Sequence, residues 1–161
     1  MTVPADADAG GTGWDRSRWL GLLALGVAPW VLVVVGAELT LVFPFGLVDP
    51  QPLHVTSLAD YLFRFTRGLP RFLLAWPAAV SLYLAGLASA SLRFVDREDP
   101  RVSAALFGFA GASLLWVTLG FARRAGYVAV PLGTVLLWVA VWWLYAGRLG
   151  DALPGSHDRE A

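Results

Sequence analysis

The chain contains no cysteine, and its 161 residues also lack lysine, isoleucine and asparagine. Without cysteine it can form no disulfide, thiolate nucleophile, cysteine-bound zinc site or sulfur-linked lipid anchor. All twelve basic residues are therefore arginine. Lysine, isoleucine and asparagine have AT-rich codons, so we attribute their absence to a GC-rich genome.

Net charge and imidazole are equally scarce. Twelve basic residues balance twelve acidic ones, and this neutrality gives no overall field that would attract nucleic acid, which we exclude as a partner. The only histidines are His54 and His157, too few for a haem or zinc site and absent from the apolar stretches, where a serine nucleophile would need a base. We expect no cofactor, no metal and no enzymatic activity.

What the chain has instead is four long stretches without a charged residue. They cover residues 19–37, 72–92, 102–122 and 125–147. A helix that crosses a bilayer needs about 20 mostly apolar residues, so each stretch has the length of a span. The sequence therefore predicts an all-α fold, a four-transmembrane-helix bundle over residues 18–148, between disordered tails at 1–17 and 149–161.

The first stretch has an alternative interpretation as a cleaved secretory signal, because arginines precede it and Val35-Gly36-Ala37 resembles a cleavage site. Its apolar run exceeds the roughly 7–15 residues of a signal core, so a retained helix is preferred. No predicted span contains an Asp, Glu, His or Arg side chain, which argues against a proton pump or an ion-coupled carrier.

The connection between the first two spans is long enough to hold structure of its own. Leu39–Val48 is apolar but broken by Pro44 and Gly46, which predicts a strand-like or re-entrant interfacial segment. Residues 57–68 show helical spacing of apolar side chains, with Ser57 and Asp60 arranged as a capping box and Arg64 placed to pair with Asp60. We expect a short amphipathic helix in the headgroup layer, or packed against the mouth of the bundle.

Arg64, Arg67 and Arg71 follow one another at i, i+3 and i+7. On a continuous helix they would share a face and contact anionic lipid headgroups, at about 1 kcal/mol each. Glu38, at the end of the first predicted span, could form an interfacial ion pair with one of them. The alternative for Glu38 is a hydrated interfacial carboxylate.

Small residues recur every four positions in the second and third spans. They are Ser81, Ala85 and Ser89, and Ala104, Gly108 and Ala112. Small residues let helix backbones approach closely in lipid, so we expect these two spans to pack there, with a serine bond contributing roughly 0.6 kcal/mol. Pro29, Pro77 and Pro131 fall in three spans and predict helix kinks.

The distribution of arginine favours one orientation. Arg16 and Arg18 precede the first span, whereas Glu38 and Asp49 follow it. Because positively charged segments resist translocation, we expect a multi-pass cell-membrane protein with both termini in the cytoplasm.

The order of several motifs resembles a known group of proteins. The motifs are Arg18-Trp19-Leu20, Pro29-Trp30, Leu41–Val48, Tyr61-Leu62-Phe63, Thr66–Pro77 and Pro131-Leu132-Gly133-Thr134. Together they resemble an uncharacterised family of short multi-pass membrane proteins from halophilic archaea. The resemblance implies membrane location and architecture, and it carries no catalytic residue across.

These observations favour a non-enzymatic membrane subunit that contacts lipids and assembles with another membrane protein or with itself. A second hypothesis is a small carrier or channel-like protein that uses the proline-kinked spans. A third, an enzyme acting on lipids, would have only Glu38, His54 and Asp60 as material.

Overall fold

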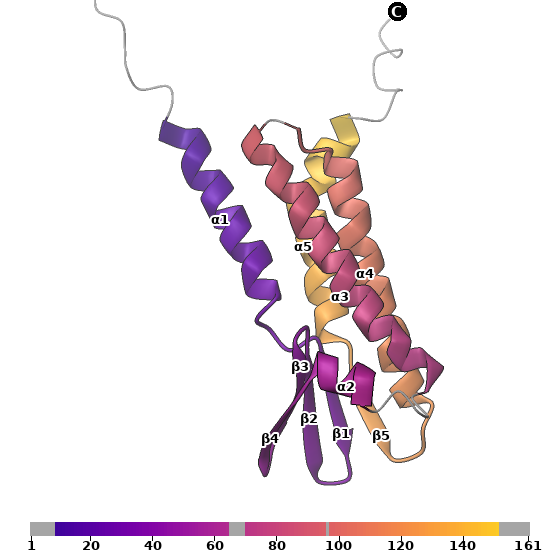
Figure 1. Ribbon diagram of the computed structural model, residues 1–161. Helices are drawn as coiled ribbons and strands as arrows, with labels where there is room; N and C mark the ends of the chain where they lie inside the picture. The colour runs from indigo at the N-terminus through magenta and orange to yellow at the C-terminus, as the bar shows by residue number, and fades with distance from the viewer. Residues whose placement is uncertain (1–8, 65–69, 96, 152–161) are drawn as a thin grey trace, which may run out of the picture.

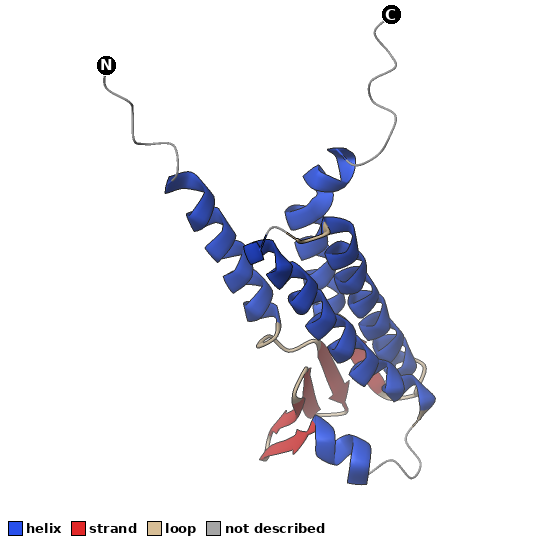
Figure 2. Ribbon diagram, turned by 45° about the horizontal axis from the view of Figure 1, so that its top comes forward, coloured by secondary structure: helices blue, strands red, loops and turns tan. Residues whose placement is uncertain are grey.

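Long helices and a small sheet make up the protein in the computed structural model, which describes residues 9–64, 70–95 and 97–151. The long helices are α1 (Ala9–Leu25), α3 (Ala75–Ser91), α4 (Pro100–Ala122) and α5 (Leu132–Asp151). A short helix, α2 (Leu58–Arg64), and two 3-10 turns, η1 (Arg71–Leu74) and η2 (Leu92–Val95), complete the helical part. Helices α3, α4 and α5 pack side by side, and the sheet lies at one end of them (Figures 1 and 2).

The sheet has five antiparallel strands in the order β4-β3-β2-β1-β5. The strands are β1 (Val31–Val35), β2 (Glu38–Phe43), β3 (Gly46–Pro50), β4 (Leu53–Ser57) and β5 (Tyr127–Val130). Strands β1 to β4 follow one another in the chain as hairpins. Strand β5 follows α4 in the sequence and pairs with β1, with Ala129 opposite Val33. The fold is therefore α+β, and the predicted all-α four-transmembrane-helix bundle is wrong.

The predicted first span, residues 19–37, is divided between a helix and a strand. Helix α1 ends at Leu25, and β1 begins six residues later, after Pro29. Valine supplies four of the five residues of β1, and its branched side chain is restricted in a helix but packs well on a pleated sheet. Gly36, with φ of 61°, then turns the chain into β2.

The predicted fourth span, residues 125–147, is divided in the same way. Gly126, with φ of 82°, leads into β5, whose side chains alternate between half-buried and exposed. Pro131 follows and cannot donate a backbone hydrogen bond, so the strand ends before α5 begins at Leu132. An apolar run long enough for a span here holds a strand, a break and a helix.

The other two predicted spans, 72–92 and 102–122, are helices. Helix α3 with its flanking 3-10 turns covers Arg71–Val95, and α4 covers Pro100–Ala122. Both are long and apolar enough, by length and composition alone, to cross a membrane. At the start of α4 the side chain of Asp99 accepts a hydrogen bond from the Arg101 backbone N–H at 2.9 Å, a normal N-cap.

The segment after β4 follows its sequence signals closely. The backbone N–H of Asp60 donates to Ser57 Oγ at 3.0 Å, and Arg64 Nε lies 3.5 Å from Asp60 Oδ1, as the capping box and the i, i+4 spacing predict. Residues 65–68 of the predicted helix lie outside the described residues. The strand-like segment predicted at Leu39–Val48 is present as parts of β2 and β3.

None of the three prolines interrupts a helix. Pro29 and Pro131 lie between elements, and Pro77 lies in the first turn of α3, where no helical hydrogen bond requires its missing N–H. Helix α1 begins at Ala9 and α5 continues to Asp151, so both enter the segments predicted as tails. The remaining tail residues, 1–8 and 152–161, lie outside the described part of the chain.

The inner face of the sheet rests on the helix ends. Val31, Val33 and Val42 are buried there together with Trp30 and Trp76. Trp76 Nε1 donates to the Phe43 carbonyl at 3.0 Å, which joins α3 to β2. The backbone N–H at position 133, the second residue of α5, donates to the Trp30 carbonyl at 2.6 Å. The sheet is therefore fixed to the helices at two points.

Candidate functional site

The side of the sheet that faces away from the helices is apolar. We call this surface the outer sheet face. By strand register and alternation it carries ten apolar side chains, together with Gly46, Pro50 and Ser57. The ten are Leu32, Val34, Leu39, Leu41, Phe43, Val48, Leu53, Val55, Val128 and Val130. Leu53 is 78% exposed, Val128 62% and Val55 57%. An antiparallel sheet with one solvated face normally alternates apolar and polar residues, and this sheet does not.

Contiguous apolar surface of this kind marks protein or membrane interaction sites. Strand β4 is at the edge of the described sheet and pairs with β3 on one side. Main-chain groups on its other side could therefore pair with a strand of a partner. None of the ten side chains carries charge, and a partner would therefore be recognised by shape and apolar contact.

A cavity of about 210 Å³ lies on the opposite, inner side of the sheet. Its lining comes from the sheet and from the helices, and consists of Val33, Val35, Thr40, Val42, Leu47, Tyr61, Leu73, Trp76, Val117, Phe121 and Tyr127. Most of these side chains are apolar or aromatic. The walls have the composition of a small-molecule site, although the volume is below the roughly 300 Å³ of drug-sized pockets.

The polar features of the cavity are few and specific. Thr40 Oγ1 donates to Asp49 Oδ1 at 2.5 Å, so that a carboxylate lies directly behind the threonine hydroxyl. Burial raises the pKa of the Tyr61 phenol, and the nearby Arg124 guanidinium opposes that rise. Tyr61 therefore stays protonated at neutral pH.

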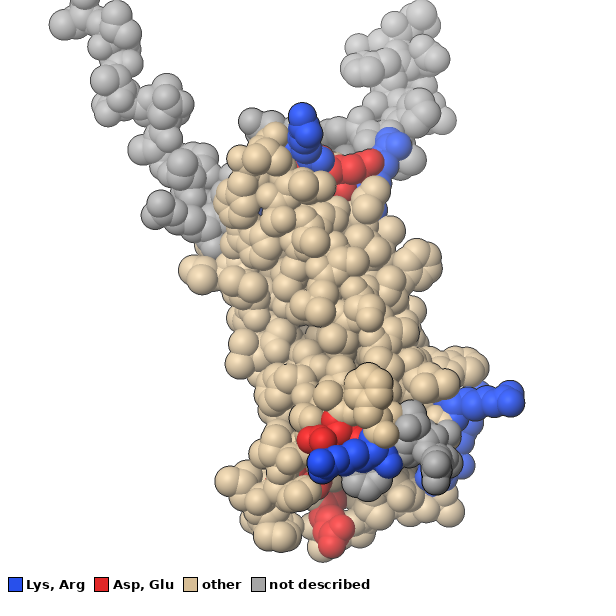
Figure 3. Space-filling view, viewed as in Figure 1, with Lys and Arg blue, Asp and Glu red and all other residues tan. Residues whose placement is uncertain are grey.

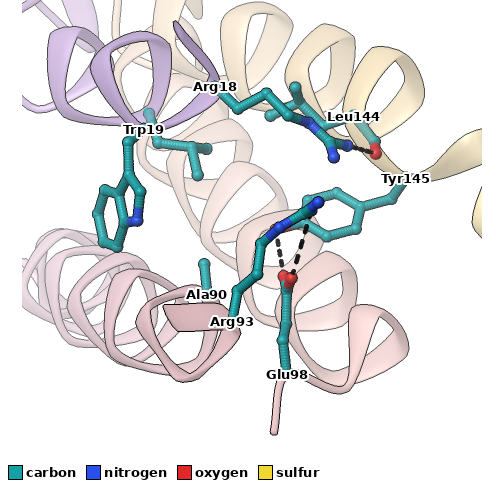
Figure 4. A pocket seen from close by; sticks show the side chains of 8 residues that line it. Arg18, Trp19, Ala90, Arg93, Glu98, Leu144 and Tyr145 are labelled. Atoms are coloured by element: carbon teal, nitrogen blue, oxygen red, sulfur yellow. Dashed lines mark hydrogen bonds and ion pairs between the residues drawn. The ribbon is translucent and has the colours of Figure 1, made fainter. Parts of the chain in front are cut away.

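A polar cluster lies at the other end of the helices, where α1, η2 and α5 approach one another (Figure 4). The Tyr145 hydroxyl donates to Glu98 Oε1 at 3.1 Å, and Arg93 Nη1 lies 3.9 Å from Glu98 Oε2. Arg18 donates to the Leu144 carbonyl, which ties α1 to α5. The Glu98 side chain is only 7% exposed, and contacts with these partners offset the cost of removing its carboxylate from water.

The size of the space within this cluster decides its role. The pocket among these side chains holds about 20 Å³, room for roughly one water molecule. No substrate fits there. The cluster joins three chain segments by hydrogen bonds and an ion pair, and we interpret it as structural.

Two of the three residues predicted to contact lipid headgroups, Arg64 and Arg71, lie on different elements. Arg64 ends α2 and pairs with Asp60, whereas Arg71 begins η1 and is exposed. Arg67 lies outside the described residues. Glu38 is exposed at the β1–β2 hairpin, and Arg64 pairs with Asp60. The ion pair of Glu38 with Arg64, Arg67 or Arg71 stays a prediction, because Arg67 is not among the described residues.

The six small residues predicted at the contact of the second and third spans have mixed environments. Helices α3 and α4 do pack together, and the hydroxyls of Ser89 and Ser103 are 2.9 Å apart across them. Ala104 is buried, but Ser81, Ala85 and Ala112 are exposed, and the Gly108 carbonyl accepts from Trp138 of α5. Gly86 of α3 is a close contact between these helices, because a Cβ there would lie 2.8 Å from the Phe107 side chain of α4.

The residues considered for a lipid enzyme lie on three different elements. Glu38 belongs to β2, His54 to β4 and Asp60 to α2. His54 is opposite Asp49 in the β3–β4 register, a neighbour that the sequence did not suggest. Among the described residues, no group of three or more His, Asp or Glu could hold a metal ion.

Charged side chains gather at the two ends of the molecule in the view of Figure 3, with an uncharged surface between them. By the elements that carry or flank them, Arg93 and Glu98 lie at the end with the α3–α4 connection, and Arg64, Arg123 and Arg124 lie at the end with the sheet (Figure 1). The surface between includes exposed apolar side chains on three helices: Leu84, Phe109, Trp116, Val135, Trp138 and Val139. A helix that is apolar on its exposed side is typical of a membrane environment.

Neither the outer sheet face nor the cavity was foreseen. Both depend on β1 and β5. The residues of these strands were predicted to be parts of membrane-spanning helices, because the apolar runs that contain them are long enough for a span. Available signals were the valine run at 31–35, bounded by Pro29 and Gly36, and the alternation from Tyr127 to Val130 before Pro131.

Comparison with known proteins gives a family but no activity. No curated protein matches the chain. Residues 4–153 match a family model described as a domain of unknown function, DUF8050. Because that match covers nearly the whole sequence, the chain belongs to the DUF8050 family.

Proposed function

We propose that the protein is a non-enzymatic membrane assembly subunit that binds a partner protein through its outer sheet face. The observation that carries this proposal is the apolar character of that face, which leaves Leu53, Val55 and Val128 exposed on the isolated chain. Covering them would remove apolar area from water at about 25 cal/mol per Å². A second copy of this chain is a suitable partner, because the outer sheet face carries no charge that would repel the same face of another protomer.

Membrane location is the second part of the proposal. It is supported by the length and apolar composition of α3 and α4 and by the uncharged surface between the charged ends. In this arrangement α3 and α4 cross the bilayer, α1 and α5 lie beside them, and the sheet lies at one membrane surface. The exposed Trp142 and Trp143 of α5 suit the interfacial region.

The resemblance to multi-pass proteins of halophilic archaea is part of the same proposal, and it agrees with the GC-rich composition. Contacts of Arg64, Arg67 and Arg71 with lipid headgroups are proposed as separate anchors rather than as one helical face. The charge bias around α1 supports termini in the cytoplasm.

The carrier alternative is less well supported. It requires span hydroxyls that line a hydrated path, whereas Ser81, Thr118 and Thr134 donate to the backbone carbonyls of Pro77, Leu114 and Gly111, each at 2.9 Å. The first two hydroxyls are satisfied within their own helices, and the third joins α5 to α4.

The test uses two exposed valines at opposite ends of the molecule. Val55 lies on the outer sheet face and is 57% exposed, and Val95 lies in η2 and is 61% exposed. In mild detergent, the wild-type protein should form a dimer or retain a partner, and Val55→Arg should weaken that association at least tenfold, because the interface would bury an unpaired charge. Val95→Arg should leave it unchanged.

Association is measured as the mass of the purified complex by light scattering, together with identification of any protein retained. A wild-type chain that is monomeric and solitary at all concentrations would contradict the assembly proposal. So would equal effects of the two substitutions.

A further inference from the structure

We infer that the cavity on the inner side of the sheet binds a small neutral alcohol, with the apolar part of the ligand among the aromatic walls and its hydroxyl donating to Thr40. The site lies on the opposite side of the sheet from the outer sheet face. It is therefore independent of partner binding, and only the delivery of an apolar ligand from the bilayer rests on the proposed membrane location.

The volume sets the size of the ligand. The cavity holds about 210 Å³. An apolar protein cavity of about 150 Å³ stays dry and takes up benzene, which by proportion gives this one room for about eight non-hydrogen atoms. An apolar cavity left empty loses dispersion contacts around its lining, so a ligand of this size is favoured to enter.

The walls set the apolar character. Four aromatic rings from four elements line the space: Tyr61 of α2, Trp76 of α3, Phe121 of α4 and Tyr127 of β5. Tyr61 meets Trp76 edge-on with centroids 5.6 Å apart, and Phe121 stacks on Tyr127 at 6.1 Å. Rings held in these positions by one another form a preformed apolar site rather than a flexible one.

Thr40 sets the polar end of the ligand. Its single hydroxyl proton is donated to Asp49, so the oxygen of Thr40 has only lone pairs to offer and the ligand must donate. An anionic ligand would meet the Asp49 carboxylate behind that hydroxyl. An ammonium ion would lose its hydration among apolar walls. A neutral hydroxyl meets both conditions.

Benzyl alcohol and ethylbenzene, each with eight non-hydrogen atoms, are the matched probes. Binding is measured by equilibrium dialysis against the protein in nanodiscs, with empty nanodiscs to subtract partitioning into lipid. Wild-type protein should show one saturable site per chain, with about tenfold preference for benzyl alcohol, the contribution expected of one good hydrogen bond.

Two variants and a control locate the site. Thr40→Val keeps the side-chain shape and should remove the preference while retaining ethylbenzene. Leu47→Phe fills the cavity and should abolish saturable binding of both probes. Val139→Phe, at a 59% exposed position of α5, should bind as wild type does. Circular dichroism of each variant identifies any that fails to fold, and Thr40→Val, the smallest change, keeps the test decisive if Leu47→Phe does not.

The inference is overturned if the wild-type protein shows no saturable binding. It is also overturned if folded Leu47→Phe binds as wild type does, or if Thr40→Val retains the preference for the alcohol. Failure of the assembly test with Val55→Arg would leave each of these results unchanged, so the two proposals fail separately.

Discussion

Glycine 133 shows how a single position sets the distance between the sheet and the helices. Its N–H donates to the Trp30 carbonyl at 2.6 Å, and a Cβ at this position would lie 2.9 Å from Trp30 Cα and 2.8 Å from Leu114 Cδ1. Trp30 is 1% exposed and leads directly into β1. The Trp30 backbone, with which an added Cβ would collide, cannot move without displacing β1.

We predict that Gly133→Ala lowers the free energy of unfolding by about 1–3 kcal/mol, the usual cost of inserting a methyl group into a filled space. Gly108→Ala in α4 is the control, because no atom lies within 4 Å of its added Cβ. That change should be neutral or stabilise the helix by up to about 1 kcal/mol. Denaturant unfolding in detergent, followed by circular dichroism, measures both. Equal stability of the two variants would contradict the close contact.

At the scale of residues, local signals in the sequence were reliable where both partners lie within one turn. The contact of Ser57 with Asp60, and of Asp60 with Arg64, follows from spacing alone. The pairing of Thr40 with Asp49 could not be found in this way, because it depends on the register of β2 against β3. Residue type is printed in the sequence, but register is set by the whole sheet.

At the scale of elements, the joint between α3 and β2 is a hydrogen bond from a buried indole. Trp76 is 1% exposed, and its Nε1 donates to the Phe43 carbonyl at 3.0 Å. The same ring lines the cavity and meets Tyr61. One side chain therefore holds a helix, a strand and the short helix α2 together.

We predict that Trp76→Phe costs about 2 kcal/mol of stability, from the lost hydrogen bond and the smaller ring. Backbone amides of β2 should exchange with deuterium faster than in the wild-type protein, because the strand loses its link to α3. Trp142→Phe is the matched control: Trp142 is 76% exposed, so its exchange pattern and stability should change by less than about 0.5 kcal/mol. Unchanged exchange in β2 of Trp76→Phe would show that the indole does not hold the sheet.

The elements also show where sequence reasoning reached its limit. The apolar runs at 72–92 and 102–122 were correctly predicted as helices, because the second contains no proline and the proline of the first, Pro77, lies in the first turn of α3, where it does not break the helix. The runs at 19–37 and 125–147 are equally apolar but contain Pro29 and Pro131. Hydrophobicity indicates burial and does not distinguish a strand from a helix. The prolines and the valine content were therefore the only sequence signals for a strand in these two runs.

At the scale of the whole molecule, the chain separates two ends. The start of α1, the α3–α4 connection and the end of α5 lie at one end, and the sheet lies at the other (Figure 1). Because the sequence has no cysteine, single cysteines introduced at the two ends can be labelled without background. If the helices cross a membrane, the two ends face different compartments.

We predict that Ala37→Cys, in the exposed β1–β2 hairpin, reacts with a membrane-impermeant maleimide added outside intact cells. Arg97→Cys, exposed near the start of α4, should react only after the membrane is opened, in agreement with cytoplasmic termini. The two labelling efficiencies, read by gel shift, are compared before and after lysis. Labelling of both positions from outside would contradict the membrane-spanning arrangement.

The place of β5 in the sheet has a consequence for synthesis. A ribosome releases β1 to β4 long before β5, and α3 and α4 must emerge in between. During that interval the edge of β1 that β5 later occupies offers unpaired amides and carbonyls beside a run of valines, which is the kind of template on which nascent chains aggregate. Completion of the sheet therefore waits until α4 has been synthesised, and a chain truncated after α4 would be released with that edge permanently open.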